Sequence, residues 1–83
     1  MRIQLALFAS LTQYLPEAED SDRLGAYAQM IDLPDGTTVG QVVARLGLPD
    51  EPRIVFASNR HAPDEHVLQE GERLAIFPPV AGG

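Results

Sequence analysis

The sequence finishes with Gly82 and Gly83, and these two residues offer its most specific chemistry. They follow the stretch Phe77-Pro78-Pro79-Val80-Ala81, whose two prolines fix φ at about −65° and favour an extended backbone. Glycine has no Cβ, so a narrow channel in another protein can admit these last residues in almost any conformation. The pattern predicts a tail over residues 78–83 that carries the Gly83 carboxylate into the active site of a partner.

Few other residues could do chemistry. The sequence has no cysteine, which excludes disulfides, thiolate metal sites and a cysteine nucleophile. His61 and His66 are spaced so that their rings do not share one face of a helix, and we therefore expect no metal site. The acidic residues of segment 17–22 lie in a polar connection, which we interpret as a solvated loop. We expect that the chain is not an enzyme on its own.

Composition limits the classes of protein and partner. A chain of 83 residues makes one small domain, and its 45% hydrophobic and 22% charged content is ordinary for a globular protein. A net charge of −6 argues against nucleic acid and anionic membranes as partners and favours a basic protein surface, although it could also serve solubility alone. The first residues lack the apolar core of a signal peptide, so a cytoplasmic location is expected.

All six basic residues are arginines, and the sequence contains no lysine. A lysine amine is the nucleophile that would most readily divert an activated acyl group. The absence of lysine therefore suits a chain whose C-terminal carboxylate is chemically activated, although genome composition would explain it equally well.

Hydrophobic periodicity predicts the elements of the first half of the chain. Apolar and polar residues alternate over residues 2–8, which indicates a half-buried strand. Ser10 and Gln13 have the spacing of a capping box, which would open a short helix that Pro16 ends. A polar loop follows. A second strand is then predicted from three alternating apolar residues, with Gln29 as the exception on their face: Tyr27, Ile31 and Leu33.

The second half is predicted to hold the main helix and the rest of the sheet. After the turn at residues 34–36, Thr38 and Gln41 repeat the capping-box spacing, and Gly47 supplies a helix stop. The helix between them has an apolar face formed by Val39, Val42, Val43 and Leu46. Residues 54–57 read as a nearly continuous buried strand, and residues 73–77 as the last strand after a turn at residues 69–72.

These elements predict an α+β fold in which a mixed sheet of four to five strands packs on one main helix, with one short helix in addition. The predicted domain covers residues 1–77 and the extended tail covers residues 78–83. In the last strand Leu74 and Ile76 point to the core, so Phe77 should lie on the opposite face of the sheet. There it is either an exposed anchor for a partner or packed against Pro79 or Val80.

The order of elements, together with the segment Phe77-Pro78-Pro79-Val80-Ala81-Gly82-Gly83, resembles the molybdopterin synthase small subunit, one of the ubiquitin-like sulfur carriers. The resemblance covers the whole chain, and the tail is its most specific part. It implies a ubiquitin-like β-grasp fold. The stretch at residues 17–26 and the segment at residues 61–66 carry no motif of that family.

The resemblance also implies a chemistry and a set of partners. An E1-like activating enzyme would use ATP to adenylate the Gly83 carboxylate, and a sulfur donor protein would convert it into a thiocarboxylate. The large subunit of molybdopterin synthase would then use that sulfur in making the molybdenum cofactor. Phe77, Pro78, Pro79, Val80 and Ala81 would dock and thread the tail, Gly82 would give steric access, and the chain itself would bind no cofactor.

Three alternatives stay open from the sequence. The chain could carry sulfur for another pathway, such as thiamine, cysteine or a tungsten-pterin cofactor, although the thiamine carrier usually lacks the Phe-Pro-Pro element. It could be a ubiquitin-like modifier that forms isopeptide bonds with lysines of target proteins. It could also be a β-grasp interaction module whose Gly82-Gly83 end is inert.

Overall fold

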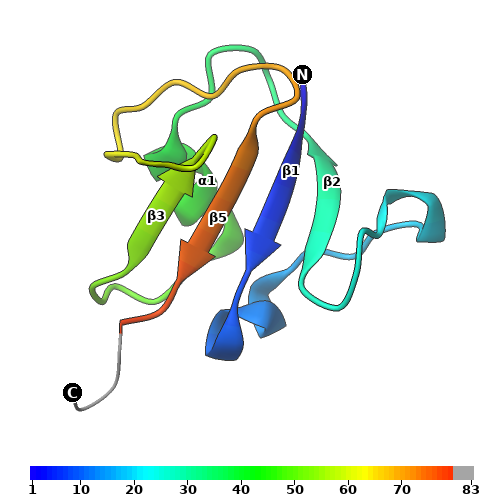
Figure 1. Cartoon of the computed structure of the whole chain (residues 1–83), viewed down its shortest axis with the longest axis horizontal. Helices are drawn as coiled ribbons and strands as arrows, with labels where there is room; N and C mark the ends of the chain where they lie inside the picture. The colour runs from blue at the N-terminus through cyan, green and yellow to red at the C-terminus, as the bar shows by residue number, and fades with distance from the viewer. Residues whose placement is uncertain (80–83) are drawn as a thin grey trace.

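The computed structural model describes residues 1–79 of the protein. One mixed sheet of five strands, in the order β2-β1-β5-β3-β4, lies in front of helix α1 (Figure 1). β1 and β5 are parallel neighbours at its centre, and the other pairs are antiparallel. The elements are β1 (Arg2–Leu7), η1 (Ala9–Tyr14), η2 (Asp20–Asp22), β2 (Ala28–Asp32), α1 (Val39–Leu46), β3 (Ile54–Ala57), β4 (Arg60–His61) and β5 (Arg73–Phe77), where η marks a 3-10 helix. The predicted α+β class is confirmed.

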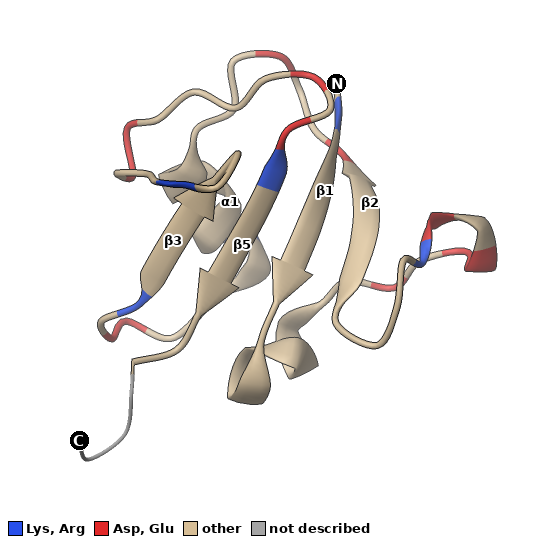
Figure 2. Ribbon diagram, viewed as in Figure 1, with Lys and Arg blue, Asp and Glu red and all other residues tan. Residues whose placement is uncertain are grey.

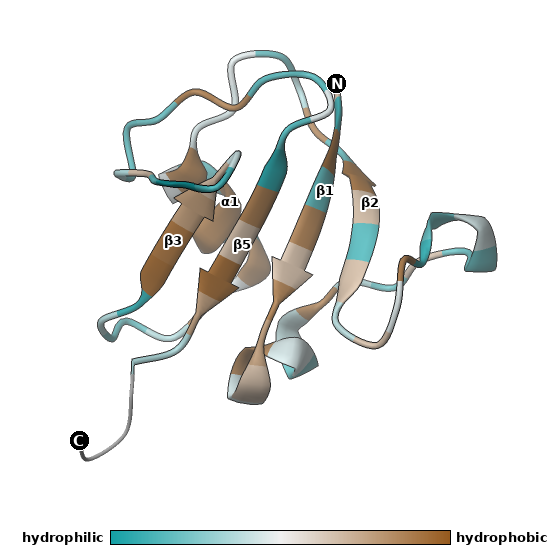
Figure 3. Cartoon of the chain, in the orientation of Figure 1, coloured by the Kyte–Doolittle hydropathy of each residue, from teal (hydrophilic) through white to brown (hydrophobic). Residues whose placement is uncertain are grey.

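The core lies between the two central strands and the helix. Alternation along β1 and β5 sends every second side chain to the helix side, and these side chains are apolar (Figure 3). Burying one such leucine or isoleucine contributes about 1.5–3 kcal/mol to stability. The residues in the core without exposed surface are Ile3, Leu5, Leu7, Val39, Leu74 and Ile76.

Helix α1 begins and ends where the sequence predicts. The capping box is formed in both directions, because the Gln41 N–H donates to Thr38 Oγ1 at 3.2 Å and the Thr38 N–H donates to Gln41 Oε1 at 2.9 Å. Gly47 ends the helix with a φ of 71°, a left-handed conformation that glycine adopts at low cost. The apolar face of the helix therefore meets the sheet in a fixed orientation.

The predicted capping box at Ser10 is wrong. The short helix is the 3-10 helix η1, its N-cap is Phe8, and no side chain caps it. Ala9 has a left-handed φ of 52°, and the N-cap at Phe8 lies two residues before the predicted one, so Ser10 lies inside the helix. Gln13 Nε2 donates instead to the Ser10 carbonyl at 2.9 Å. A short helix is present as predicted, but the turn at Ala9 starts it.

The sequence analysis missed β4. Ser58 and Asn59 both have positive φ, 52° and 67°, and this tight turn sends the chain back along β3. Arg60 and His61 then pair with Ala57 and Phe56. A Ser-Asn turn without glycine is a weak hairpin signal, and no strand is predicted from the sequence at residues 60–61.

A buried carboxylate holds the turn before β5. Glu72 accepts hydrogen bonds from the Gln69 N–H at 3.0 Å and the Ser58 hydroxyl at 2.8 Å, and its oxygens lie 3.2 Å from His66 Nε2. Burial alone would raise the pKa of Glu72, but these hydrogen bonds and the charge of His66 outweigh burial and leave that pKa below its ordinary value. The carboxylate therefore ties β5 to the turn after β3 and to the 66–69 segment.

The capping box gives a first prediction. Thr38→Ala removes the oxygen that accepts from the Gln41 N–H, so the free energy of unfolding should fall by about 1 kcal/mol. Urea denaturation followed by circular dichroism measures this change. Thr38→Ser keeps the oxygen and is the matched control, expected to lose much less. Equal losses in the two variants would show that the cap contributes nothing.

Glu72 gives a prediction about pH. A folded-state pKa below the unfolded value means that the carboxylate stabilises the fold at neutral pH. That stabilisation should be lost as the pH falls below the ordinary value of 4.5 and through the lowered folded value. Glu72→Gln should cost about 1–3 kcal/mol at pH 7, and the gap between variant and wild type should narrow in acid. Urea denaturation at several pH values tests this, and a gap independent of pH would contradict it.

Candidate functional site

The tail begins after Phe77, the last residue of β5, which is one of the two central strands of the sheet. Pro78 is half-buried and Pro79 is exposed. Both line a narrow crevice with Leu11, Leu48 and Pro49, so the start of the tail rests against the body of the domain. The predicted site residues Val80, Ala81, Gly82 and Gly83 lie outside the described residues.

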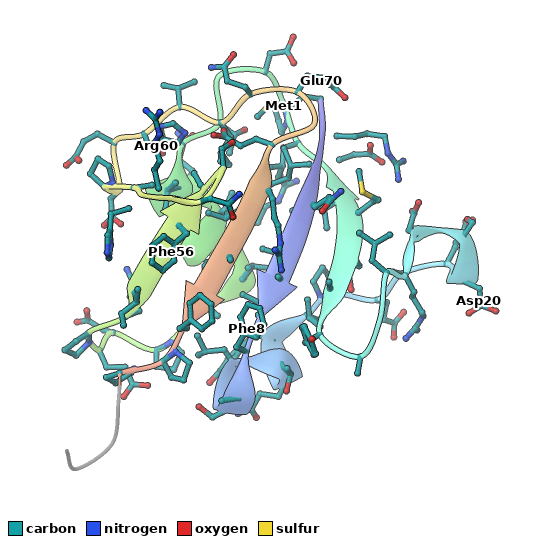
Figure 4. All side chains as sticks on the ribbon, viewed as in Figure 1. Met1, Phe8, Asp20, Phe56, Arg60 and Glu70 are labelled. Atoms are coloured by element: carbon teal, nitrogen blue, oxygen red, sulfur yellow. The ribbon has the colours of Figure 1, made fainter. Side chains whose placement is uncertain are left out.

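Phe77 is the middle member of a line of rings, which we call the aromatic row. Its ring stacks on Phe8 with centroids 4.3 Å apart and an interplanar angle of 5°, and it meets Phe56 edge-on at 6.0 Å. Tyr27 lies 4.9 Å from Phe8, and His61 lies 4.5 Å from Phe56. The row therefore crosses the whole sheet, from the β2 side to β4. Two of its members, Phe8 and Phe56, are labelled in Figure 4. Stacked and edge-on pairs of this kind stabilise each other beyond their area burial.

The strand register produces this row. The Phe8 N–H donates to the Ile76 carbonyl at 3.2 Å, which continues the β1–β5 pairing by one residue and brings Phe8 beside Phe77. In β3 and β5, Phe56 pairs with Ala75 and Ile54 pairs with Phe77. The left-handed turn at Ala9 follows at once, so the chain leaves the sheet directly after Phe8.

Small residues accompany the row on the same face. Ala6 pairs with Ala28 on one side and with Ala75 on the other, and all three point away from helix α1. Ala6 and Ala75 are nearly fully buried. The half of this face that carries the aromatic row and the alanines is apolar, whereas the other half carries Gln4 and Arg73, and α1 covers neither half (Figure 1). Such a face on a small domain is typical of a protein interaction site.

The structure qualifies the prediction for Phe77. The prediction that it lies on the face opposite Leu74 and Ile76 is confirmed, since those two are fully buried in the core. The ring is half-buried rather than exposed, and its aromatic contacts are with Phe8 and Phe56. Phe77 is therefore one part of a larger surface.

Sequence reasoning missed Phe8 and Phe56 as members of this surface. Residues 54–57 were interpreted as buried on both faces, which is wrong, because only Val55 and Ala57 reach the core. The alternation of side chains along β1 and β3 did contain a signal for both residues. Phe8 continues the positions that point away from the core in β1, and Phe56 lies between two core residues.

Among residues 1–79, no group of three or more histidine, cysteine, aspartate or glutamate side chains could hold a metal ion. No helix in that part of the chain is both long and apolar enough to cross a bilayer. The chemistry of the aromatic row is that of apolar contact, and it lies directly beside the point where the tail begins. The arrangement is suited to holding a partner beside the start of the tail.

Comparison with known proteins identifies relatives of the whole chain. The family model described as the ThiS family matches residues 8–83. Among solved structures, SAMP1 from Haloferax volcanii is 22% identical with a TM-score of 0.69, and all of each chain is covered. A second structure, described as small archaeal modifier protein 1 of the same organism, is 21% identical with a TM-score of 0.69, covering 95% of this chain and 98% of that chain.

A third solved structure carries a different name. It is from Pyrococcus furiosus and carries the provisional name molybdopterin converting factor, subunit 1, with 19% identity and a TM-score of 0.65. The match covers 95% of this chain and 98% of that chain. The predicted ubiquitin-like β-grasp fold is confirmed by these neighbours.

Proposed function

Because the chain belongs to the ThiS family, we propose that it is a sulfur carrier whose Gly83 carboxylate is converted into a thiocarboxylate. The observation that carries the proposal is the position of the uncovered aromatic row, directly beside the point where the tail starts. A partner that buries the row also receives the tail. The proposal divides the chain into a domain over residues 1–77, which binds the partner, and a tail over residues 78–83, which carries the Gly83 carboxylate.

The chemistry takes place on the tail and uses groups supplied by other proteins. An E1-like activating enzyme holds ATP, and an oxygen of the Gly83 carboxylate attacks the α-phosphate, so that pyrophosphate leaves. A sulfur donor protein then supplies a hydrosulfide equivalent, which bonds to the acyl carbon as AMP leaves. Neither step needs a cysteine or a bound cofactor in this chain, and the sequence has no cysteine.

For the pathway, we propose molybdopterin synthesis. The Phe77-Pro78-Pro79 element supports it, as does the likeness to a protein named molybdopterin converting factor, subunit 1. The large subunit would supply the acid and base groups, and Gly83 would return to a carboxylate after giving up its sulfur. Thiamine, cysteine and tungsten-pterin pathways use the same terminal chemistry and are the neighbouring candidates. The route consumes ATP and a pterin precursor, so we place it in the cytoplasm.

A second candidate function is protein modification. Two of the solved structures described above are of a small archaeal modifier protein, which favours this candidate. An activated Gly83 could acylate a lysine of a target protein. The chain has no lysine of its own, so it offers no isopeptide acceptor to another copy of itself.

Intact-mass spectrometry of the protein from its native host tests the terminal chemistry. We expect a species heavier by the difference between sulfur and oxygen, located at Gly83, and deletion of Gly83 should abolish sulfur transfer while leaving the fold intact. A Gly83–lysine adduct on other proteins would support the modifier function instead. An unmodified mass after incubation with ATP, activating enzyme and sulfur donor would contradict the carrier function.

The aromatic row gives a prediction about docking. Phe77→Ala removes the central ring, so binding to the large subunit should weaken by about 1–3 kcal/mol, measured by isothermal titration calorimetry. Val67→Ala is the matched control, because Val67 is exposed and lies outside the row. A loss for Phe77→Ala no larger than for Val67→Ala would show that the row is not the docking surface. Circular dichroism of both variants checks that they are folded.

A further inference from the structure

The outer edge of β2 is only partly covered by the rest of the chain. The Leu24 N–H donates to the Ala28 carbonyl at 2.9 Å, and Arg23 forms an isolated antiparallel bridge with Gln29. The segment before Arg23 turns away as the 3-10 helix η2. The first half of the edge therefore has a partner, and the second half, toward Asp32, has none among residues 1–79.

The pairing with β1 decides which groups face that open half. Met1 and Leu33 bond to each other in both directions. The Met1 amine donates to the Leu33 carbonyl at 2.7 Å, and the Leu33 N–H donates to the Met1 carbonyl at 2.8 Å. The Leu7 N–H donates to the Tyr27 carbonyl at 2.9 Å. Odd-numbered residues of this stretch thus bond to β1, so even-numbered residues direct their backbone groups outward. The carbonyl of Met30 and both backbone groups of Asp32 consequently face the outer edge.

A groove of about 740 Å³ runs along this edge, between the 16–22 segment and helix α1. Its volume is in the range of sites that hold small ligands or short peptide segments. On the helix side the groove is lined mainly by apolar residues, among them Ile31, Leu33 and Leu46, and Arg45 is the one charged residue that α1 contributes. An extended chain lying here would alternate its side chains between these apolar residues and the opposite wall.

The opposite wall is acidic. Glu17, Glu19, Asp22 and Asp32 line the groove, whereas its basic residues are Arg2 and Arg45. Figure 2 shows acidic residues on the η2 segment, beyond the β2 edge. The Arg2 guanidinium already donates to Asp22 and Asp32, and its hydrogen bond to Asp22, with the charges of both carboxylates, raises the pKa of Arg2. Glu17 and Glu19 form no ion pair with any of the described residues.

We propose that the groove between segment 16–22 and helix α1 binds an extended peptide segment of a partner protein in which apolar and basic residues alternate. The peptide backbone bonds to Met30 O and to the backbone of Asp32, which extends the sheet by one strand. Its apolar side chains contact Leu33 and Leu46, and its basic side chains lie near Glu17 and Glu19. The site is separate from the aromatic row and does not depend on the chemistry of Gly83.

Charge argues for this occupant over a second copy of the chain. Pairing two β2 edges would bring the carboxylates of Asp22, Asp32 and their neighbours from both copies together, in a protein whose net charge is −6. Like charges placed opposite each other across an interface are unfavourable. A basic segment meets no such repulsion.

The test is a titration of the full ¹⁵N-labelled chain with a capped synthetic peptide of alternating valine and lysine, followed by amide chemical shifts. We expect shifts confined to residues 30–33, segment 16–22 and the C-terminal turn of α1, and slower hydrogen exchange at the Asp32 amide. A peptide of alternating valine and glutamate should bind much more weakly. No shifts at millimolar peptide, shifts centred on the aromatic row, or equal binding of the two peptides would overturn the proposal.

Paired variants separate the backbone and charge contributions. Asp32→Pro and Asp32→Ala both lose the contact with Arg2, but only Asp32→Pro loses the outward N–H. Asp32→Pro should therefore bind the valine–lysine peptide about fivefold more weakly than Asp32→Ala.

The double variant Glu17→Lys with Glu19→Lys should weaken binding of the same peptide about fivefold. Glu65→Lys, on an exposed turn outside the groove, should not weaken it. Proton spectra show whether each variant is folded. Folded variants with unchanged affinity would overturn the proposal.

Discussion

The parallel pairing of β1 with β5 is the interaction on which the rest of the structure depends. It joins the first and last strands of the chain at the centre of the sheet, and it aligns Leu5 with Leu74 and Leu7 with Ile76 on the helix side. Their burial forms the middle of the core. The same register, continued by the hydrogen bond from Phe8 to Ile76, places Phe8 beside Phe77 on the other side. The core and the aromatic row are thus two consequences of one strand pairing.

The elements that sequence analysis predicted well are those whose signals are local. The capping box of Thr38 and Gln41 and the stop at Gly47 lie within one short segment, and α1 has the predicted limits. The alternation in β1 and β5 is equally local, and it correctly placed Phe77 away from the core. At these positions propensity, pattern and packing favour the same structure.

Two kinds of feature could not be predicted from the sequence: turns that lack a strong sequence signal, and contacts that depend on the register between strands. The turns at Ala9 and at Ser58-Asn59 use positive φ in residues other than glycine, so the start of η1 and the strand β4 were not foreseen. The aromatic row joins residues from separate strands, and only the register shows that Phe8, Phe56 and Phe77 meet. The groove beside β2 likewise depends on where segment 16–22 folds back.

The stacking of Phe8 on Phe77 has a consequence for the timing of recognition. These rings come from opposite ends of the chain and meet only after the pairing of greatest sequence separation has formed, which is the kind of contact that costs most in chain entropy. A chain still emerging from the ribosome, or one with a misplaced last strand, cannot assemble the row. A partner that docks on this surface, as proposed above, would therefore bind only those chains in which the last strand is already paired with the first.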